Sequence, residues 1–443
     1  MRILAFGRNR ADVLARRRAG NFSLLSMFMF LFALRGVTEG IDHYLGTPVS
    51  IILTSGIIIL SLVILIGGRC LFSTKHLILI SASSLFLLSA SFSIILSSEI
   101  PLGGQISKLI QYVLYVLVFL VAATAPWKAH HVRTLLVAFM LLSGIELLFS
   151  IYQFATGSGM GADDFDIRRS FGLMSHPTIL SVKIILILLI FFLFRDLLSG
   201  YAWIIMGIFS AISIALTFSR VGWIFGILFI GFYTLSFAKG AVKGFMIAIA
   251  APLLIYTLIA SGRFDDLSTT RDFIESGNYQ SFRGEQIENS FDWRLVQWYH
   301  MINVGFERPF SGHGLASSSH LNQFHLSSHN SFIDIFVDQG YFGLFTLLTF
   351  LGTMFAIPYK NIKYISYNVV DYKGSRLILN TLFLGSILIM SFAMSLFNQL
   401  FNMATIVLIL GFLSNTWSPQ RTRQLERDID GKVDASKNGL ISV

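Results

Sequence analysis

Long apolar stretches separated by short polar ones are the dominant pattern of this chain. A membrane-spanning helix needs about 20 largely apolar residues. That criterion predicts an all-α, polytopic membrane helix bundle with about 12 transmembrane helices. The expected spans cover residues 21–38, 48–66, 76–97, 106–125, 132–155, 177–195, 201–218, 221–238, 243–261, 335–357, 376–396 and 399–417.

Two polar segments interrupt the apolar pattern. The shorter one, residues 156–176, mixes acidic residues with Arg168 and Arg169, and we expect these charges to neutralise one another. The longer one, residues 262–330, is rich in Ser, Asn and His. Within it, the stretch SFDWRLVQWYHMINVG predicts an amphipathic helix that rests on the membrane surface or on the ends of the bundle. Its expected apolar stripe consists of Leu295, Trp298, Tyr299 and Ile302.

This pattern divides the chain into five regions. We expect a basic cytoplasmic tail, an N-terminal transmembrane bundle, a periplasmic loop with its amphipathic helix, C-terminal transmembrane helices, and a disordered cytoplasmic tail. In that order the regions cover residues 1–20, 21–261, 262–334, 335–417 and 418–443.

Composition supports the membrane class and indicates an orientation. The chain is 54% hydrophobic and 13% charged, which excludes an ordinary soluble protein. The net charge of +9 reflects cationic cytoplasmic loops rather than a nucleic-acid partner. Placing both termini in the cytoplasm puts about twice as many Lys and Arg inside as outside. That count assigns Arg35 and Lys108 to the outer side. The single cysteine, Cys70, excludes an intramolecular disulfide.

His329 is the first candidate for chemistry, because it lies where the long polar segment meets a predicted span. A histidine at this boundary is suited to act as a general base on a substrate from the aqueous side. Gly340 follows about three helical turns later, so the two are expected to share one helix face, which Gly340 opens to close approach. The alternative role for His329 is a helix cap.

Three arginines are candidates for phosphate binding, since a guanidinium group pairs bidentately with phosphate oxygens. Arg220 lies between two closely spaced spans, and a boundary arginine that reaches the interface is its alternative role. Arg294 lies beside the expected apolar stripe, where an ion pair with Asp292 or Glu288 is the alternative. Arg263 follows the ninth span and is the weakest of the three.

Other polar residues leave several roles open. His176 precedes Pro177 at a helix start, where capping and substrate lining are both reasonable. Lys183 and Glu146 lie within spans, where they line a groove or pair with each other. His320, His325 and His329 are too loosely spaced for a zinc site, so we expect no metal, and His313 is expected in a turn. The sequence contains no G-x-S-x-G, P-loop or H-E-x-x-H motif.

Several motifs in one order resemble the bacterial O-antigen ligase and O-antigen polymerase family of integral membrane glycosyltransferases. They are RRSFGLMSHP, the pair Ser219-Arg220, WRLVQW, RPFSGHGL and HNSF followed by QGYFG. The likeness covers roughly residues 160–350.

The resemblance implies a fold related to C-type glycosyltransferases and an activity at the periplasmic face of the inner membrane. The donor would be a glycan on undecaprenyl diphosphate, and the acceptor a hydroxyl of lipid A–core (ligase) or of a lipid-linked repeat unit (polymerase). No metal, cofactor or nucleotide sugar is implied. His329 would be the base and Arg220 and Arg294 would hold the diphosphate. Gly340, His176 and Trp298 would have structural or substrate-lining roles.

The single large outer loop favours ligase over polymerase. A membrane transporter is the alternative from another class, with Lys183 and Glu146 as coupling residues. Transporters often contain inverted repeats, and none is evident in this sequence. A non-catalytic membrane scaffold is a third possibility.

Overall fold

A computed structural model of the chain describes most of the predicted spans and part of the long polar segment. The described residues are 24–38, 42, 48–67, 70, 74–97, 100–158, 160–162, 165–174, 176–194, 197, 200–219, 222–228, 271–277, 290–322, 327–365 and 399–415.

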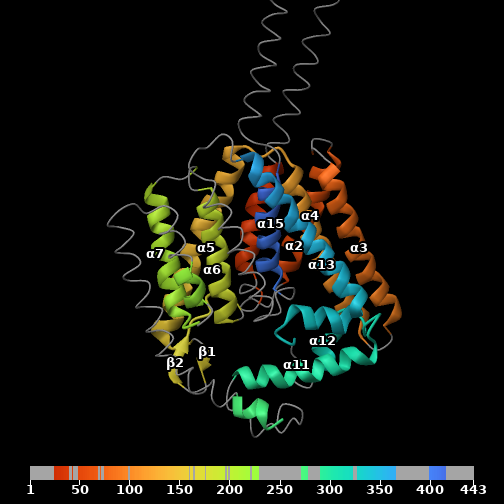
Figure 1. The fold of residues 1–443 in the computed structure, drawn as a ribbon. Coiled ribbons are helices and arrows are strands. Elements are labelled where there is room, and N and C mark those ends of the chain that lie inside the picture. The colour runs from red at the N-terminus through yellow and green to blue at the C-terminus, as the bar shows by residue number, and fades with distance from the viewer. Residues whose placement is uncertain are drawn as a thin grey trace, which may run out of the picture.

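The described part of the chain is a bundle of long helices that run roughly side by side (Figure 1). A first helix, Leu24–Thr38, precedes α2. The labelled helices are α2 (Val49–Ile66), α3 (Thr74–Leu96), α4 (Leu102–Thr124), α5 (Ala129–Thr156), α6 (Pro177–Leu193), α7 (Gly200–Leu216), α11 (Ser290–Glu307), α12 (Ser317–Leu321), α13 (Ser331–Ile365) and α15 (Leu400–Ser414).

The helices other than α11 and α12 coincide with predicted spans, which confirms the expectation of a helical, multi-pass membrane protein. Of the span expected at 221–238, only residues 222–228 are described. Among the described residues, five helices are long and apolar enough to cross a membrane, and four shorter apolar helices accompany them. The spans expected at 243–261 and 376–396 lie outside the described residues, so the total number of spans stays a prediction. The span expected to start at residue 335 begins at Ser331 instead.

The interior of the bundle is built around α15, which packs against α4, α6 and α13. Nearly all of α15 is buried, including Met403, Ile406 and Leu410. Close approach to α4 depends on a small residue, since a Cβ atom at position 411 would lie 2.8 Å from the Phe119 carbonyl oxygen. A helix that is apolar on all sides, as α15 is, therefore occupies the centre rather than the edge of the bundle.

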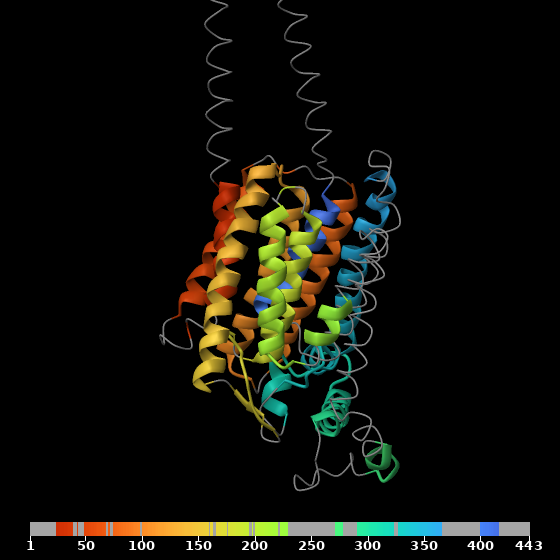
Figure 2. The same ribbon diagram turned by 90° about the vertical axis from the view of Figure 1, so that its left-hand side faces the viewer.

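The start of the first described helix and the end of the last one, α15, lie at the same end of the bundle. Near the start of the first helix, Phe28 lies 6.2 Å from Trp127, ring centroid to ring centroid. After α15, the Asn415 side chain donates to the Ala122 and Ala125 carbonyl oxygens, 2.9 and 3.0 Å away. Helices α11 and α12 lie at the opposite end (Figures 1 and 2).

The shorter polar segment, residues 156–176, contains a two-stranded hairpin, which corrects the all-α prediction locally. Strands β1 (Met160–Ala162) and β2 (Phe165–Arg169) pair antiparallel, with Met160 opposite Arg169. The connection between α5 and α6 is rich in Gly, Asp and Arg and lacks the long apolar run of a spanning helix. Pairing two short strands satisfies backbone groups that would otherwise need water.

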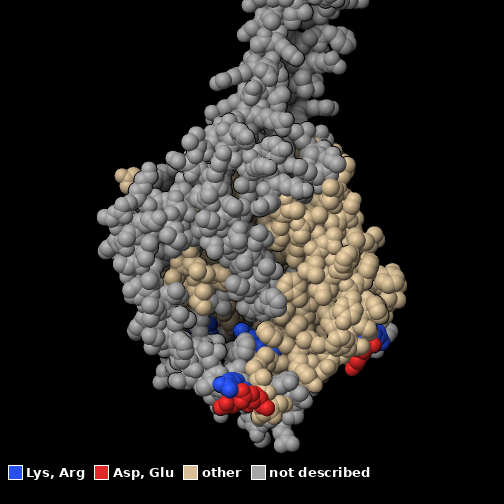
Figure 3. All heavy atoms as spheres, viewed as in Figure 1, with Lys and Arg blue, Asp and Glu red and all other residues tan. Residues whose placement is uncertain are grey.

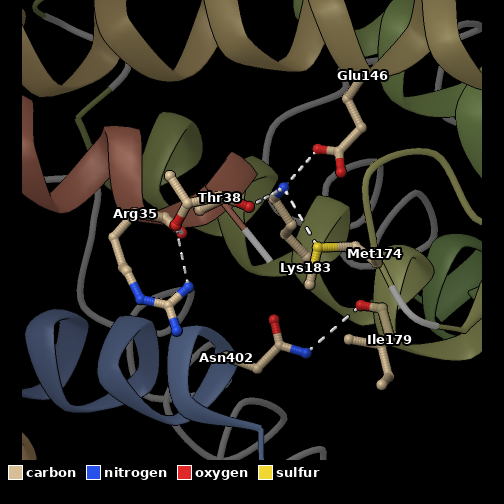
Figure 4. Close-up of polar contacts among 8 residues, drawn as sticks. Arg35, Thr38, Glu146, Met174, Ile179, Lys183 and Asn402 are labelled. Carbon is tan, nitrogen blue, oxygen red and sulfur yellow. Dashed lines mark hydrogen bonds and ion pairs between the residues drawn. The ribbon is translucent and has the colours of Figure 1, made fainter. Parts of the chain in front are cut away.

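Two cations that the orientation count assigned to the outer side are buried within helices. Arg35 is buried in the first helix, where Nε donates to Thr54 Oγ1 at 3.1 Å. Its Nη1 donates to Thr38 Oγ1 at 3.3 Å (Figure 4). Lys108 is buried in α4. Their assignment to the outer side stays a prediction, whereas their burial among polar partners from neighbouring helices is not revealed by a one-dimensional hydropathy pattern.

Candidate functional site

The segment before α13 is held in a tight polar turn. Asn330 Oδ1 accepts hydrogen bonds from the backbone N–H groups of Phe332 and Ile333 at 3.0 and 3.2 Å, which is the geometry of a helix N-cap. Asp334 Oδ1 accepts from the backbone N–H and the hydroxyl of Ser328 at 3.0 and 2.7 Å. His329 lies between these contacts with φ of 55°, the left-handed conformation.

This turn corrects two expectations about His329. The helix cap is Asn330, so His329 is not required to cap α13. His329 and Gly340 do not share a helix face, because His329 precedes the helix and Gly340 breaks it with φ 68° and ψ −165°. Such a conformation favours glycine.

Gly340 is a packing residue. The RPFSGHGL segment runs against the break in α13: the His313 N–H donates to the Val337 carbonyl at 2.9 Å and the Tyr341 N–H donates to the Pro309 carbonyl at 2.7 Å. A Cβ atom at Gly340 would lie 2.7 Å from that Pro309 oxygen. The predicted close approach is therefore confirmed, and the two motifs contact each other rather than the site around His329.

Helix α11 brings aromatic and cationic side chains to the His329 turn. Trp298 Nε1 donates to the Ser328 carbonyl at 2.8 Å, so Trp298 has a structural role. The Trp293 and His329 rings lie 5.5 Å apart, centroid to centroid. The helix itself was predicted, but its inward face was not: Val296 and Met301 are buried, whereas Tyr299 and Ile302 are exposed. The inward face also carries a buried polar residue, Gln297, which spoils the apolar periodicity.

Arg294 is a cation of this site. It is partly buried, and burial lowers the pKa of its guanidinium group from the usual value. Among the described residues it has no hydrogen-bond or ion-pair partner, and the predicted alternative pair with Asp292 does not form. A partly buried, uncompensated guanidinium is suited to an incoming anion.

His176 lies at the same site and caps α6. Its Nδ1 accepts from the Thr178 N–H at 3.1 Å. Burial, followed by the positive charge of Arg169 and then by His329 and Arg294, lowers the pKa of His176 to about 4. The two roles left open for His176, capping and lining, are therefore compatible.

His329 is kept neutral by its surroundings. Burial lowers its pKa below the usual 6.5, the charge of Arg294 lowers it further, and Asp334 acts in the opposite direction. A neutral imidazole at physiological pH has a nitrogen lone pair that can accept a proton.

Arg169 is a site residue that the sequence analysis did not select. It ends β2, donates from Nε to the Thr217 carbonyl at 3.3 Å, and influences the charge of His176. Its expected neutralisation by nearby acids stays a prediction, since Asp163 and Asp164 lie outside the described residues. The sequence contained one signal for Arg169, because this residue lies in RRSFGLMSHP, the motif that also contains His176.

Arg220 and Arg263 lie outside the described residues, as do His325 and Glu288. The described neighbours of Arg220 contact the beginning of α6. Ser181 donates to Ser219 Oγ at 3.2 Å, and a Cβ atom at Gly222 would lie 2.9 Å from Ser181 Oγ. Ser181 follows His176 by little more than one helical turn, so this contact is near the site.

Lys183 and Glu146 pair with each other in the bundle interior (Figure 4). Lys183 Nζ lies 2.5 Å from Glu146 Oε2, and the two side chains are only 2% and 3% exposed. The same Nζ donates to the Gly36 carbonyl at 2.5 Å and lies 3.7 Å from Met174 Sδ. Of the two roles predicted for these residues, the structure favours pairing.

Cationic side chains are visible in a hollow near the end of the bundle where α11 lies (Figure 3). No group of three His, Cys, Asp or Glu side chains in the described part of the chain could hold a metal ion. His320 is exposed, and His313 lies in a turn with Nε2 2.9 Å from the Val304 carbonyl. The cationic groups gathered at this end are suited to an anion.

Residues 204–348 match a family model described as O-antigen ligase. The predicted resemblance to the O-antigen ligase and polymerase family is confirmed. No curated protein matches the chain. The O-antigen ligase segment contains Arg294, His329 and Gly340, whereas Arg169 and His176 precede it. The site therefore combines side chains from this segment with side chains from outside it.

Proposed function

We propose that this protein transfers a glycan from undecaprenyl diphosphate to a sugar hydroxyl of lipid A–core, as an O-antigen ligase of the bacterial inner membrane. The observation that carries the proposal is the proximity of two residues within the matched segment 204–348: His329, whose pKa is lowered by burial and by Arg294, and Arg294, which has no hydrogen-bond or ion-pair partner among the described residues. Both termini would lie in the cytoplasm and the α11 end in the periplasm.

In the proposed reaction, His329 takes the proton of the acceptor hydroxyl. The hydroxyl oxygen forms a bond to the anomeric carbon of the donor sugar while the bond from that carbon to the diphosphate oxygen breaks. Negative charge then grows on the leaving diphosphate, and guanidinium groups stabilise it without a metal ion. Arg294 is the described residue suited to this role, and Arg220 and Arg263 are proposed as further phosphate ligands.

His176 and Arg169 extend the proposed donor site. Because Nδ1 of His176 accepts the Thr178 N–H, the neutral ring carries its proton on Nε2. That Nε2–H can donate to a diphosphate or sugar oxygen. With a pKa of about 4, His176 is neutral at physiological pH. Its Nδ1 already accepts the Thr178 N–H, so His176 is not proposed as the base.

The proposal is tested with the purified chain, a lipid-diphosphate-linked glycan and lipid A–core. We expect His329→Ala to lower the transfer rate by about 100- to 10,000-fold, the usual contribution of a general base. His320→Ala is the matched control, since His320 is exposed in the same region and should transfer at the wild-type rate. Full activity of His329→Ala would remove the catalytic assignment.

Deleting the gene distinguishes the possible acceptors. Free lipid A–core together with accumulated lipid-linked polymer indicates a ligase. Core capped with a single repeat unit indicates a polymerase, and blocked export of normal polymer indicates a transporter.

A further inference from the structure

The loop of residues 170–176 connects β2 to α6 and has a site residue at each end. Arg169 immediately precedes the loop and His176 closes it. The positions of both side chains in the site therefore depend on how the loop backbone is held.

Gln153, near the end of α5, makes three hydrogen bonds to this backbone. Its Oε1 accepts from the N–H groups of Phe171 and Gly172 at 3.0 and 2.8 Å, and its Nε2 donates to the Gly172 carbonyl at 2.8 Å. Gln153 is 1% exposed. A carboxamide is needed here, because this group both accepts and donates while remaining uncharged.

The backbone conformation of the loop fits this clamp, by which we mean the three hydrogen bonds from the Gln153 side chain. Gly172 has φ of 58°, in the left-handed region that favours glycine. A Cβ atom at Gly172 would lie 3.1 Å from Glu146 Cγ and 3.2 Å from Ser150 Oγ, so the loop is pressed against α5. Substitution by a larger residue would disturb both the turn and the packing.

Neighbouring helices hold the loop at further points. Ser170 Oγ donates to the Ser150 carbonyl at 2.8 Å, and the Ser170 N–H donates to the Leu216 carbonyl at the end of α7 at 3.0 Å. Lys183 of α6 contacts Met174. Gln153 differs from these contacts because it binds two successive peptide groups at the centre of the loop.

We propose that Gln153 is a positioning residue for glycan transfer. Its carboxamide fixes the loop so that Arg169 and His176 lie beside Arg294 and His329. Gln153 is buried behind the loop and acts through it, without touching the substrate. This inference rests on the proposed transfer reaction for its functional part.

A double-mutant cycle tests the functional part on the full chain in lipid nanodiscs. We expect Gln153→Leu to lower kcat/KM for the lipid-diphosphate donor by about 100-fold, a typical cost of misplacing site groups. Gln153→Glu, which keeps the acceptor and loses the donor, should be intermediate. In an Arg169→Ala, His176→Ala background, Gln153→Leu should have little further effect, because the groups that it positions are gone.

Gln105→Leu is the matched control. Gln105 is also buried and holds a loop at the same end, donating from Nε2 to the Ile100 carbonyl at 2.9 Å. This variant should keep wild-type kcat/KM. An equal loss from Gln153→Leu in both backgrounds would assign Gln153 a general structural role and overturn the proposal.

Hydrogen exchange tests the clamp without any reaction. Gln153→Leu should accelerate exchange of the Phe171 and Gly172 amides, and Gln105→Leu should leave them unchanged. Unchanged exchange in Gln153→Leu would disprove the clamp. Failure of the wild-type chain to transfer glycan would instead overturn the proposed function and the catalytic part of this inference, while exchange would still decide whether Gln153 holds the loop.

Discussion

At the residue scale, the site combines guanidinium groups with two imidazoles whose pKa values are lowered chiefly by burial. The pKa values of His329 and His176 are both lowered, chiefly by burial and then by neighbouring positive charge. A general base must be unprotonated to work, so lowering its pKa extends its activity towards acidic pH. The cations that the proposal assigns to phosphate binding would thus also set the pH range of the base.

Arg294 provides the test of this electrostatic coupling. Arg294→Gln removes a positive charge beside His329, so the pKa of His329 should rise and the acidic limb of the kcat/KM profile should move to higher pH. Arg294→Lys keeps the charge and loses the bidentate fork, so it should leave the limb in place and raise KM for the donor. Profiles measured from acidic to neutral pH distinguish the two variants. Arg271→Gln, an exposed arginine paired with Glu275, is the control, and an unmoved limb in Arg294→Gln would refute the coupling.

At the element scale, the start of α13 determines where His329 lies. The Asn330 cap and the Asp334 contacts define the turn, and the break at Gly340 receives the RPFSGHGL segment. The HNSF and QGYFG motifs therefore specify backbone geometry as well as chemistry.

Asn330→Ala should cost about 1 kcal/mol of stability, the usual value for losing a helix N-cap. It should also slow transfer, since His329 directly precedes the cap. Asn330→Ser, which restores a capping oxygen, should recover most of both effects. Thermal unfolding and transfer rates of the purified variants measure this. Thr349→Ala, at a half-buried position further along the same helix, is the control. Equal defects in the Ala and Ser variants would show that the cap is not the cause.

At the scale of the whole molecule, the Lys183–Glu146 pair connects separate parts of the bundle. Lys183 contacts the first helix through Gly36, α5 through Glu146 and the site loop through Met174. Its Nζ also lies 5.6 Å from the Phe401 ring centroid of α15. Removing one partner of a buried ion pair costs more stability than the pair itself contributes, because the remaining partner is left as an uncompensated buried charge.

Lys183→Met should therefore destabilise the protein by about 3–5 kcal/mol. Adding Glu146→Gln should recover part of that loss, because the remaining buried group is then uncharged. Unfolding of the variants in detergent measures both effects. Lys128→Met, at an exposed position, is the control. A double variant less stable than Lys183→Met would contradict this account.

The amino-acid sequence by itself determined the membrane class and most helix positions, and it selected His329 and Arg294 as candidate site residues. Apolar length is a local property, and a motif is contiguous, so both can be read along the chain. The inward face of α11, the break at Gly340, the burial of Arg35 and Lys108, and the addition of Arg169 to the site were decided by tertiary structure. Each depends on which distant segment lies opposite, and hydropathy at one position contains no information about its partner.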